Sequence, residues 1–374
     1  MNDRSDGSRP WSALDGYRAL AILVVMLAHA RFSAGYPDWL RPLDPFIRGG
    51  VTAFMVLSGY LVTRSLLHAE ARTGFLGIPV FLAGQVVRFY VPVLGYLAAV
   101  LMLWGWRPGF DWEGSLRVLW MAPRTAAGPM STLHLYSLAA QMQFCLWWPL
   151  VLRTVPRNQR FWPVTLLALA AVVWRWAGTR MAFDAGETHI RTDFVYAGLM
   201  VGAWWAVSAV EGRLDWIARM PRRQVLPVVA ISLVVLLFTR SPTAFVGMFS
   251  TSWRDAVLPW REVAALAFVV RVVNGLQARL ALGCLAFLLH HHRPRRLARV
   301  LAWPGLAWLG RISFSVYLWQ NVFCFGLTGT PFDRFPLNLG ASVACGAVAY
   351  AWVEKPSLRW RHRLKQRLQT PRQA

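Results

Sequence analysis

The chain has 374 residues, of which 56% are hydrophobic and only 15% are charged, and its mean hydropathy is +0.39. Soluble domains carry roughly 45–50% apolar and about 25% charged residues, so soluble, disordered and small disulfide-rich classes are excluded. The 40 Lys and Arg against 17 Asp and Glu give a formal charge of +23. Because these cations form short clusters between apolar segments, they indicate loops at an anionic lipid bilayer and no nucleic-acid binding.

Apolar segments long enough to cross a membrane follow one another along the chain, since a transmembrane helix needs about 20 residues. They predict an all-α polytopic membrane protein of about ten transmembrane helices, near 14–33, 46–66, 79–105, 133–152, 162–178, 194–210, 224–239, 262–289, 308–328 and 336–353. Arg271, Asn274 and Arg279 interrupt the eighth, which is either one long tilted helix or a span preceded by an interfacial helix. We expect 1–374 to be a single transmembrane domain with a basic cytoplasmic tail, 354–374.

The short basic loops TVPRNQR, RMPRRQ and HHHRPRRLAR fall on one side of the membrane when these spans alternate in direction. Lys and Arg concentrate in cytoplasmic loops. The pattern therefore predicts a multi-pass membrane protein with both termini in the cytoplasm.

The first span also has the outline of a secretory signal peptide, because arginines precede an apolar stretch and Ala28-His29-Ala30 imitates a cleavage site. Cleavage after Ala30 would leave an odd number of spans and remove the consistent sidedness of the basic loops. We expect residues 1–33 to be retained as the first transmembrane helix.

Arg18 and His29 lie in the first span, where ionisable residues are costly and indicate a functional site. They are eleven residues apart, which returns to within about 20° of the same helix face and separates them by about 16 Å along the axis. Histidine can act as a general base near neutral pH. The alternatives are an arginine that reaches the interface and a histidine that only packs.

Arg88 is early in the third span, where its guanidinium suits a phosphate-bearing donor at the cytoplasmic side. The alternative is ordinary anchoring by a positive residue. His134 and Ser137 begin the fourth span, with interfacial capping as the alternative. Arg191 and Asp193 are close enough in sequence for a local ion pair.

Glu354 ends the last span beside Lys355, where a structural salt bridge is the simpler interpretation. The tract His290, His291 and His292 adjoins four arginines that would repel a cation. The four cysteines lie in apolar stretches without CxxC spacing. We therefore expect no metal site and no disulfide framework.

Six segments, in order, resemble the acyltransferase-3 family of integral membrane O-acyltransferases over nearly the whole chain. They are LDGYRALAILVVMLAHA with Asp15, Arg18 and His29; GGVTAFMVLSGYLVTRSL with Ser58 and Gly59; LHLYSLAAQMQFCLWWPL with His134 and Ser137; RTDFVYAGLMVGA with Arg191 and Asp193; WLGRISFSVYLWQNVF with Gly310, Arg311, Ser313 and Tyr317; and AYAWVEKPSLRWR with Glu354.

The resemblance implies transfer of an acyl group, commonly acetyl, from cytoplasmic acyl-CoA to a hydroxyl of an extracytoplasmic glycan or related envelope acceptor. It implies a catalytic role for His29, with Arg18 as its partner and Asp15 beside them. Arg88 would bind the donor, with Ser58 and Gly59 near it. The site would be shaped by His134, Ser137, Arg191, Asp193, Tyr317 and Glu354.

The chain departs from the family pattern at several positions. Gln85 stands where an arginine is usual, Gln141 and Met142 where acids are usual, Gln320 where histidine is usual, and Thr52 near a usual aspartate. Loss of the arginine weakens a phosphate clamp, and loss of the acids removes groups that could orient others. A divergent enzyme and an inactive relative both fit, and the rival class is a transporter of a glycan or lipid intermediate, which should show internal repeats.

Overall fold

The computed structural model describes residues 12–43, 50–106, 111–116, 130–177, 192–221, 223–224, 227–228, 230–232, 276–288 and 295–369. Within these ranges the chain is helical and has no strand, which confirms the predicted all-α class. Three of the described helices are long and apolar enough to cross a membrane, namely α1 (Ala13–Ala30), α3 (Gly50–Thr73) and α4 (Ile78–Trp104).

Other helices coincide with later predicted spans: α7 (Tyr136–Thr154), α8 (Phe161–Ala177), α10 (Thr192–Val210), α17 (Pro304–Cys324) and α18 (Leu337–Ala349). Most of the predicted spans 224–239 and 262–289 lies outside the described residues, apart from an apolar helix over Leu276–Leu288. Short elements connect these helices: η1 (Asp38–Leu43), α5 (Trp112–Leu116), α6 (Met130–Leu133), η3 (Arg157–Gln159), α11 (Asp215–Ala218), α16 (Arg295–Leu301) and η6 (Pro331–Asp333).

Helices α1 and α17 pack against each other and run in the same direction, as contacts near their beginnings and toward their ends show. Near their beginnings, a Cβ on Gly310 would lie only 1.8 Å from the carbonyl oxygen of Asp15. Toward their ends, His29 contacts Gln320 through a hydrogen bond. The glycine allows the two backbones to approach closely, as small residues do between membrane helices.

Helices α3 and α10 form a second close contact. A Cβ on Gly59 would lie 2.0 Å from the carbonyl oxygen of Leu199, and one on Gly202 would lie 2.1 Å from that of Val56. Both positions require glycine for the observed separation of the helices.

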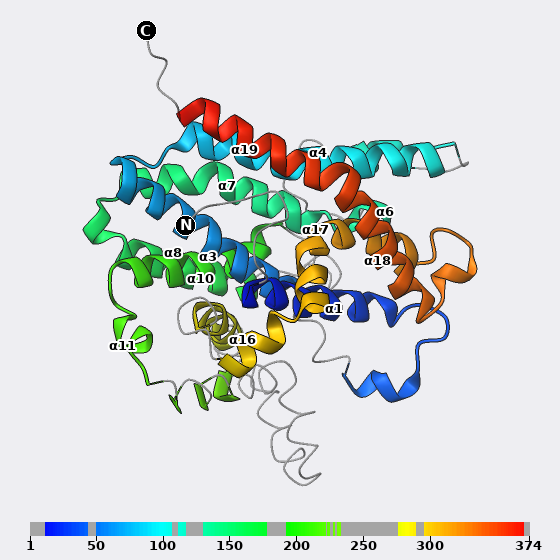
Figure 1. Cartoon of the computed structure of the whole chain (residues 1–374), viewed down its shortest axis with the longest axis horizontal. Helices are drawn as coiled ribbons and strands as arrows, with labels where there is room; N and C mark the ends of the chain where they lie inside the picture. Colours follow the sequence, from blue (N-terminus) through cyan, green and yellow to red (C-terminus); the bar gives the residue numbers. More distant parts are fainter. Residues whose placement is uncertain are drawn as a thin grey trace.

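The last helical segment is continuous through α18, the π-helical turn η7 (Tyr350–Glu354) and α19 (Lys355–Gln369). It runs antiparallel to α4, with Val353 against Gly95 and Lys365 against Gly84. Figure 1 shows α19 lying along α4 at the edge of the molecule.

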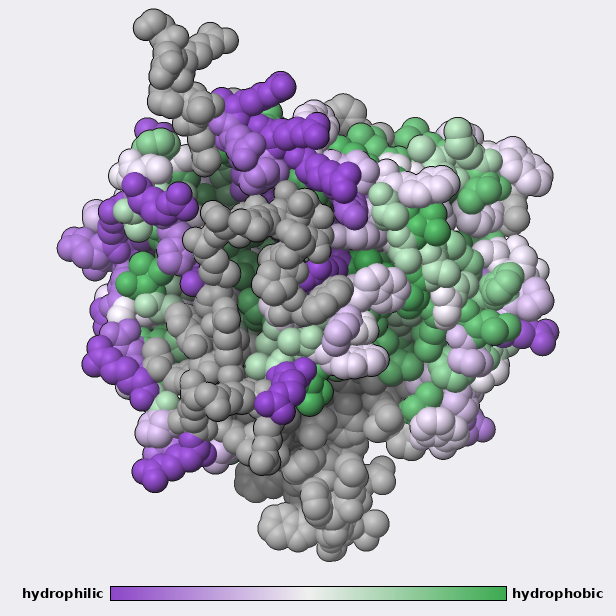
Figure 2. All heavy atoms as spheres, in the orientation of Figure 1, coloured by the Kyte–Doolittle hydropathy of each residue, from purple (hydrophilic) through white to green (hydrophobic). Residues whose placement is uncertain are grey.

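The surface divides by polarity. Figure 2 shows hydrophilic side chains gathered over α19 and along the left side of the view, whereas apolar side chains are more frequent on the right. Large apolar side chains are exposed along several of the helices, including Leu94, Met102, Leu146, Leu150, Leu166 and Trp352. Lipid rather than water is the solvent that suits them.

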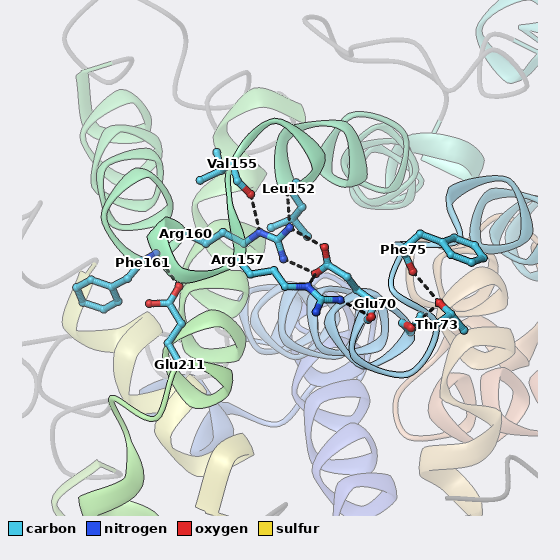
Figure 3. Close-up of polar contacts among 10 residues, drawn as sticks. Glu70, Thr73, Phe75, Leu152, Val155, Arg157, Arg160, Phe161 and Glu211 are labelled. Carbon is cyan, nitrogen blue, oxygen red and sulfur yellow. Dashed lines mark hydrogen bonds and ion pairs between the residues drawn. The ribbon is translucent and has the colours of Figure 1, made fainter.

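An ion-pair cluster fixes the corner between α3, α7 and α8 (Figure 3). The Glu70 carboxylate accepts two hydrogen bonds from Arg160, at 2.5 and 3.0 Å, and lies 3.2 Å from Nε of Arg157. Arg160 also donates to the carbonyl oxygens of Leu152 and Val155 at 2.7 and 3.1 Å. The end of α3 is thereby tied to the turn that connects α7 with α8.

Candidate active site

A cavity of about 150 Å³ lies between α1, α3, α4, α7, α17 and the last helical segment. Its lining combines apolar side chains of α3 with a polar set contributed by all of these elements. The polar residues are Arg18, Ser58, Ser65, Gln85, Arg88, Ser137, Gln141, Arg311, Ser313, Tyr317, Glu354 and Arg361.

Four guanidinium groups reach this cavity from four different helices, from Arg18, Arg88, Arg311 and Arg361. Asp15 lies between two of them, with its carboxylate oxygens 3.8 Å from Arg18 and 3.9 Å from Arg311. The same carboxylate accepts hydrogen bonds from Ser12 at 2.7 and 3.1 Å in a capping box that begins α1. One carboxylate, that of Asp15, therefore both caps the start of α1 and lies close to two of the guanidinium groups of the cavity.

Among the residues that the structure describes, the acidic residue that lines the cavity is Glu354. The turn η7 buries this side chain, which accepts a hydrogen bond of 2.5 Å from Ser315 and interacts electrostatically with Arg88 and Arg18. With Asp15 included, two carboxylates face four guanidinium groups, so the cavity keeps an excess of positive charge. It suits an anionic ligand with phosphate or carboxylate oxygens.

Gln85 provides a second indication of a ligand. Its side chain is only 3% exposed and lines the cavity, and its Oε1 atom has no hydrogen-bond partner among the described residues. A buried acceptor without a partner is destabilising by about 1–3 kcal/mol. An N–H group on a bound molecule would satisfy it.

Ser137 and Tyr317 form the polar wall where α7 meets α17. Their hydroxyl oxygens are 2.8 Å apart, and the Tyr317 hydroxyl donates to the carbonyl oxygen of His134 at 2.6 Å. The ring of His134 donates from Nε2 to the carbonyl oxygen of Leu318 at 3.1 Å. His134 therefore joins the turn between α6 and α7 to α17, while Ser137 and Tyr317 line the cavity.

His29 is one helical turn beyond this wall. Its Nδ1 atom is 2.7 Å from Oε1 of Gln320, and its ring lies 5.2 Å from that of Phe325. Gln320 follows Tyr317 by three residues on α17, a rise of about 4.5 Å. The imidazole thus lies near the cavity without lining it.

The structure brings together most of the residues predicted from the sequence. Those that line the cavity are Arg18, Ser58, Arg88, Ser137, Tyr317 and Glu354, and Asp15 and His134 contact lining residues. Gly59 lies instead at the contact between α3 and α10. Arg191 and the side chain of Asp193 lie outside the described residues.

Sequence reasoning did not assign Arg311, Arg361 or Gln320 to the site. Arg311 lies in the segment WLGRISFSVYLWQNVF, and Gln320 in the same segment departs from the family pattern, so the sequence carries a signal at both positions. Arg361 ends the segment AYAWVEKPSLRWR and begins the most basic part of the tail, where its neighbours give an ordinary reason for positive charge. The predicted absence of a metal site concerned His290–His292, which lie outside the described residues, and no cluster suited to a metal ion occurs within the described part.

Comparison with known proteins identifies the family to which the chain belongs. The sequence model of the family described as an acyltransferase domain matches residues 11–353. The putative peptidoglycan O-acetyltransferase YrhL of Bacillus subtilis is 25% identical over 393 residues, covering 95% of this chain and 56% of the relative. Peptidoglycan O-acetyltransferase OatA of Listeria monocytogenes is 25% identical over 372 residues, covering 92% and 55%.

A putative O-acetyltransferase of Staphylococcus aureus, SACOL0978, is 21% identical over 397 residues and covers 93% of this chain and 58% of its own length. The chain thus spans little more than half the length of these curated relatives. No solved structure matches it.

Proposed function

Because this chain belongs to the acyltransferase domain family, we propose that it is a membrane O-acyltransferase. It moves an acyl group, in the first instance acetyl, from cytoplasmic acyl-CoA to a hydroxyl of an extracytoplasmic glycan or related envelope acceptor. The observation that carries the proposal is the cavity into which four arginines from four helices project.

The cavity fits the donor in two respects. A CoA thioester carries several phosphate groups, and the guanidinium fork of arginine matches phosphate oxygens. Its pantetheine arm contains amide N–H groups, which are the donors that the buried Oε1 of Gln85 lacks. The missing arginine at position 85 is offset by cations from α17 and α19.

His29 supplies the base in this proposal. Its Nδ1–H donates to Gln320, which leaves the lone pair of Nε2 to accept the proton of the acceptor hydroxyl. The hydroxyl oxygen then attacks the thioester carbonyl carbon, an ester bond forms and the carbon–sulfur bond breaks. The proton passes from Nε2 to the departing sulfur, so the products are an ester and the CoA thiol.

The proposed topology has ten spans with both termini in the cytoplasm of a bacterial inner membrane. The parallel direction of α1 and α17 supports it, because these are the first and ninth predicted spans. Parallel α3 and α7 support it too, since Thr63 on α3 pairs with Trp148 on α7, and Glu70 near the end of α3 pairs with Arg160 in the turn that follows α7. In this orientation, Arg18 and α19 lie toward the cytoplasm and His29 toward the outer half.

The names of the relatives in Bacillus and Listeria support a cell-wall glycan as acceptor class. The test is to incubate the purified protein in membranes with labelled acetyl-CoA and envelope glycans, comparing wild type with His29→Ala. We expect the substitution to lower transfer by roughly 100- to 10,000-fold, the usual contribution of a general base. Expression and membrane insertion should be unchanged.

His68→Ala is the matched control, because His68 is an exposed histidine on α3 outside the cavity. An equally active His29→Ala protein would remove the imidazole from the mechanism. Absence of transfer by the wild type from any acyl-CoA would favour an inactive relative. Movement of unmodified glycan across the membrane would favour a transporter.

A further inference from the structure

We propose that α19 is part of the donor site and that Arg361 binds a phosphate group in the nucleotide portion of the acyl-CoA. The proposal rests on the proposed function and names a part of the site outside the family match, which ends at residue 353. It gives the C-terminal basic helix a specific role beyond that of a charged membrane-surface segment.

The sequence of α19, KPSLRWRHRLKQRLQ, contains six Lys and Arg residues and no Asp or Glu. Such a helix ordinarily lies on an anionic membrane surface, with its cations toward lipid headgroups. The exposed residues Arg359, Arg363 and Arg367 fit this description. Arg361 does not, because it is partly buried and lines the cavity.

The position of Arg361 is fixed by α4. A Cβ on Gly84 would lie 3.3 Å from Nε of Arg361 and 2.9 Å from Cε of Lys365. Arg361 and Lys365 are four residues apart and therefore share one face of α19. The absence of a side chain at Gly84 leaves room for both cations beside the buried amide of Gln85.

The charges that meet at this place favour a ligand with several negative charges. Arg361 joins Arg18, Arg88 and Arg311 in a cavity whose lining, among the described residues, includes one acidic residue, Glu354. Like charges gathered in a partly buried site repel one another, and the two carboxylates of Glu354 and Asp15 compensate only part of the repulsion among four guanidinium groups. A nucleotide with several phosphate groups supplies the missing negative charge.

The test compares steady-state kinetics of the full chain in phosphatidylcholine nanodiscs for wild type, Arg361→Ala, Arg361→Lys and the control Arg363→Ala. Acetyl-CoA and S-acetylpantetheine serve as donors, since the second has the thioester but lacks the nucleotide. We expect Arg361→Ala to raise the acetyl-CoA KM about tenfold or more, with kcat within about twofold. Arg361→Lys should recover part of the loss, and Arg363→Ala should behave as wild type.

With S-acetylpantetheine, wild type and Arg361→Ala should have equal kcat/KM. An acetyl-CoA KM that is the same in Arg361→Ala and Arg363→Ala would overturn the assignment. Equal losses with both donors would also overturn it, because Arg361 would then maintain the shape of the cavity rather than bind the nucleotide.

An anionic lipid headgroup carries the same phosphate chemistry, and a separate arm distinguishes it. Binding of CoA is measured by calorimetry in nanodiscs with and without phosphatidylglycerol. If Arg361→Ala leaves CoA binding unchanged in nanodiscs without phosphatidylglycerol and only removes the effect of the anionic lipid, the lipid occupies the Arg361 site and the donor assignment fails. If wild type turns over no acyl-CoA, the proposed function fails, but weaker CoA binding by Arg361→Ala than by Arg363→Ala still supports the assignment.

Discussion

The Nδ1 atom of His29 lies 2.7 Å from the Oε1 atom of Gln320, and this hydrogen bond joins α1 to α17. Gln320 is fully buried, and its Nε2 atom donates to Oδ1 of Asn321 at 2.5 Å. Because Nε2 of Gln320 donates to Asn321, the Oε1 atom of Gln320 faces the imidazole of His29. An amide oxygen can only accept, so Nδ1 of His29 must donate. The departure from histidine at position 320 therefore preserves an acceptor for His29 and leaves Nε2 available as a base.

Gln320→Leu should lower kcat by about 10- to 100-fold, because an imidazole without this acceptor loses its fixed tautomer and orientation. The acetyl-CoA KM should change by less than about twofold, since Gln320 does not line the cavity. Gln320→His should recover much of the rate, because a neutral histidine can also accept a hydrogen bond. A Gln320→Leu enzyme with wild-type kcat would show that the contact does not position His29.

Arg88→Ala should raise the acetyl-CoA KM by about tenfold or more, because a hydrogen bond to a charged group contributes about 1.5–3 kcal/mol. The acetyl-CoA KM of Arg88→Lys should lie between those of wild type and Arg88→Ala, since lysine keeps the charge but cannot form the two parallel hydrogen bonds of a guanidinium group. Initial-rate kinetics over a range of acetyl-CoA concentrations provide the measurement. Arg72→Ala, an exposed arginine on α3, is the control. An unchanged KM would count against Arg88 as a donor-binding residue.

How far the sequence predicts this site depends on what kind of information each residue carries. Helical periodicity placed Arg18 and His29 on one face of α1, and the motif positions anticipated Arg88, Ser137, Tyr317 and Glu354 around one cavity. These are residues whose polarity is costly inside a membrane, so their chemistry alone indicates a site.

Gly59 shows where prediction of the site from the sequence fails. It follows Ser58 directly, but consecutive helical residues point about 100° apart, so one faces the cavity and the other faces α10. Only the packing of a second helix separates these roles. Arg361 could not be assigned for a similar reason, because its side chain is one of several cations on α19 until the contact with α4 distinguishes it.

Gly59→Ala should destabilise the protein without a specific effect on the donor. The new Cβ would lie 2.0 Å from the carbonyl oxygen of Leu199, so α3 and α10 must separate. Overpacking of this kind costs about 1–3 kcal/mol. We expect a lower Tm in detergent and an unchanged acetyl-CoA KM for the folded fraction.

Gly340→Ala is the matched control, because a Cβ at Gly340 meets no atom within 4 Å. A raised acetyl-CoA KM for Gly59→Ala at unchanged Tm would instead place Gly59 in the donor site, as its motif position suggests.

Glu70→Ala should be the more destabilising of two ion-pair substitutions. It removes the carboxylate that accepts two hydrogen bonds from Arg160, whose side chain is only 4% exposed (Figure 3). Breaking a buried pair leaves an uncompensated charge and costs about 3–5 kcal/mol.

Asp38→Ala is the control. It breaks a pair with Arg41 whose atoms are 2.7 Å apart, but 91% of the aspartate side chain is exposed. Exposed pairs contribute at most about 1 kcal/mol, so thermal unfolding should show a large fall in Tm for Glu70→Ala and little change for Asp38→Ala. Equal Tm values for the two variants would show that the corner between α3, α7 and α8 is held by its apolar packing and not by this cluster.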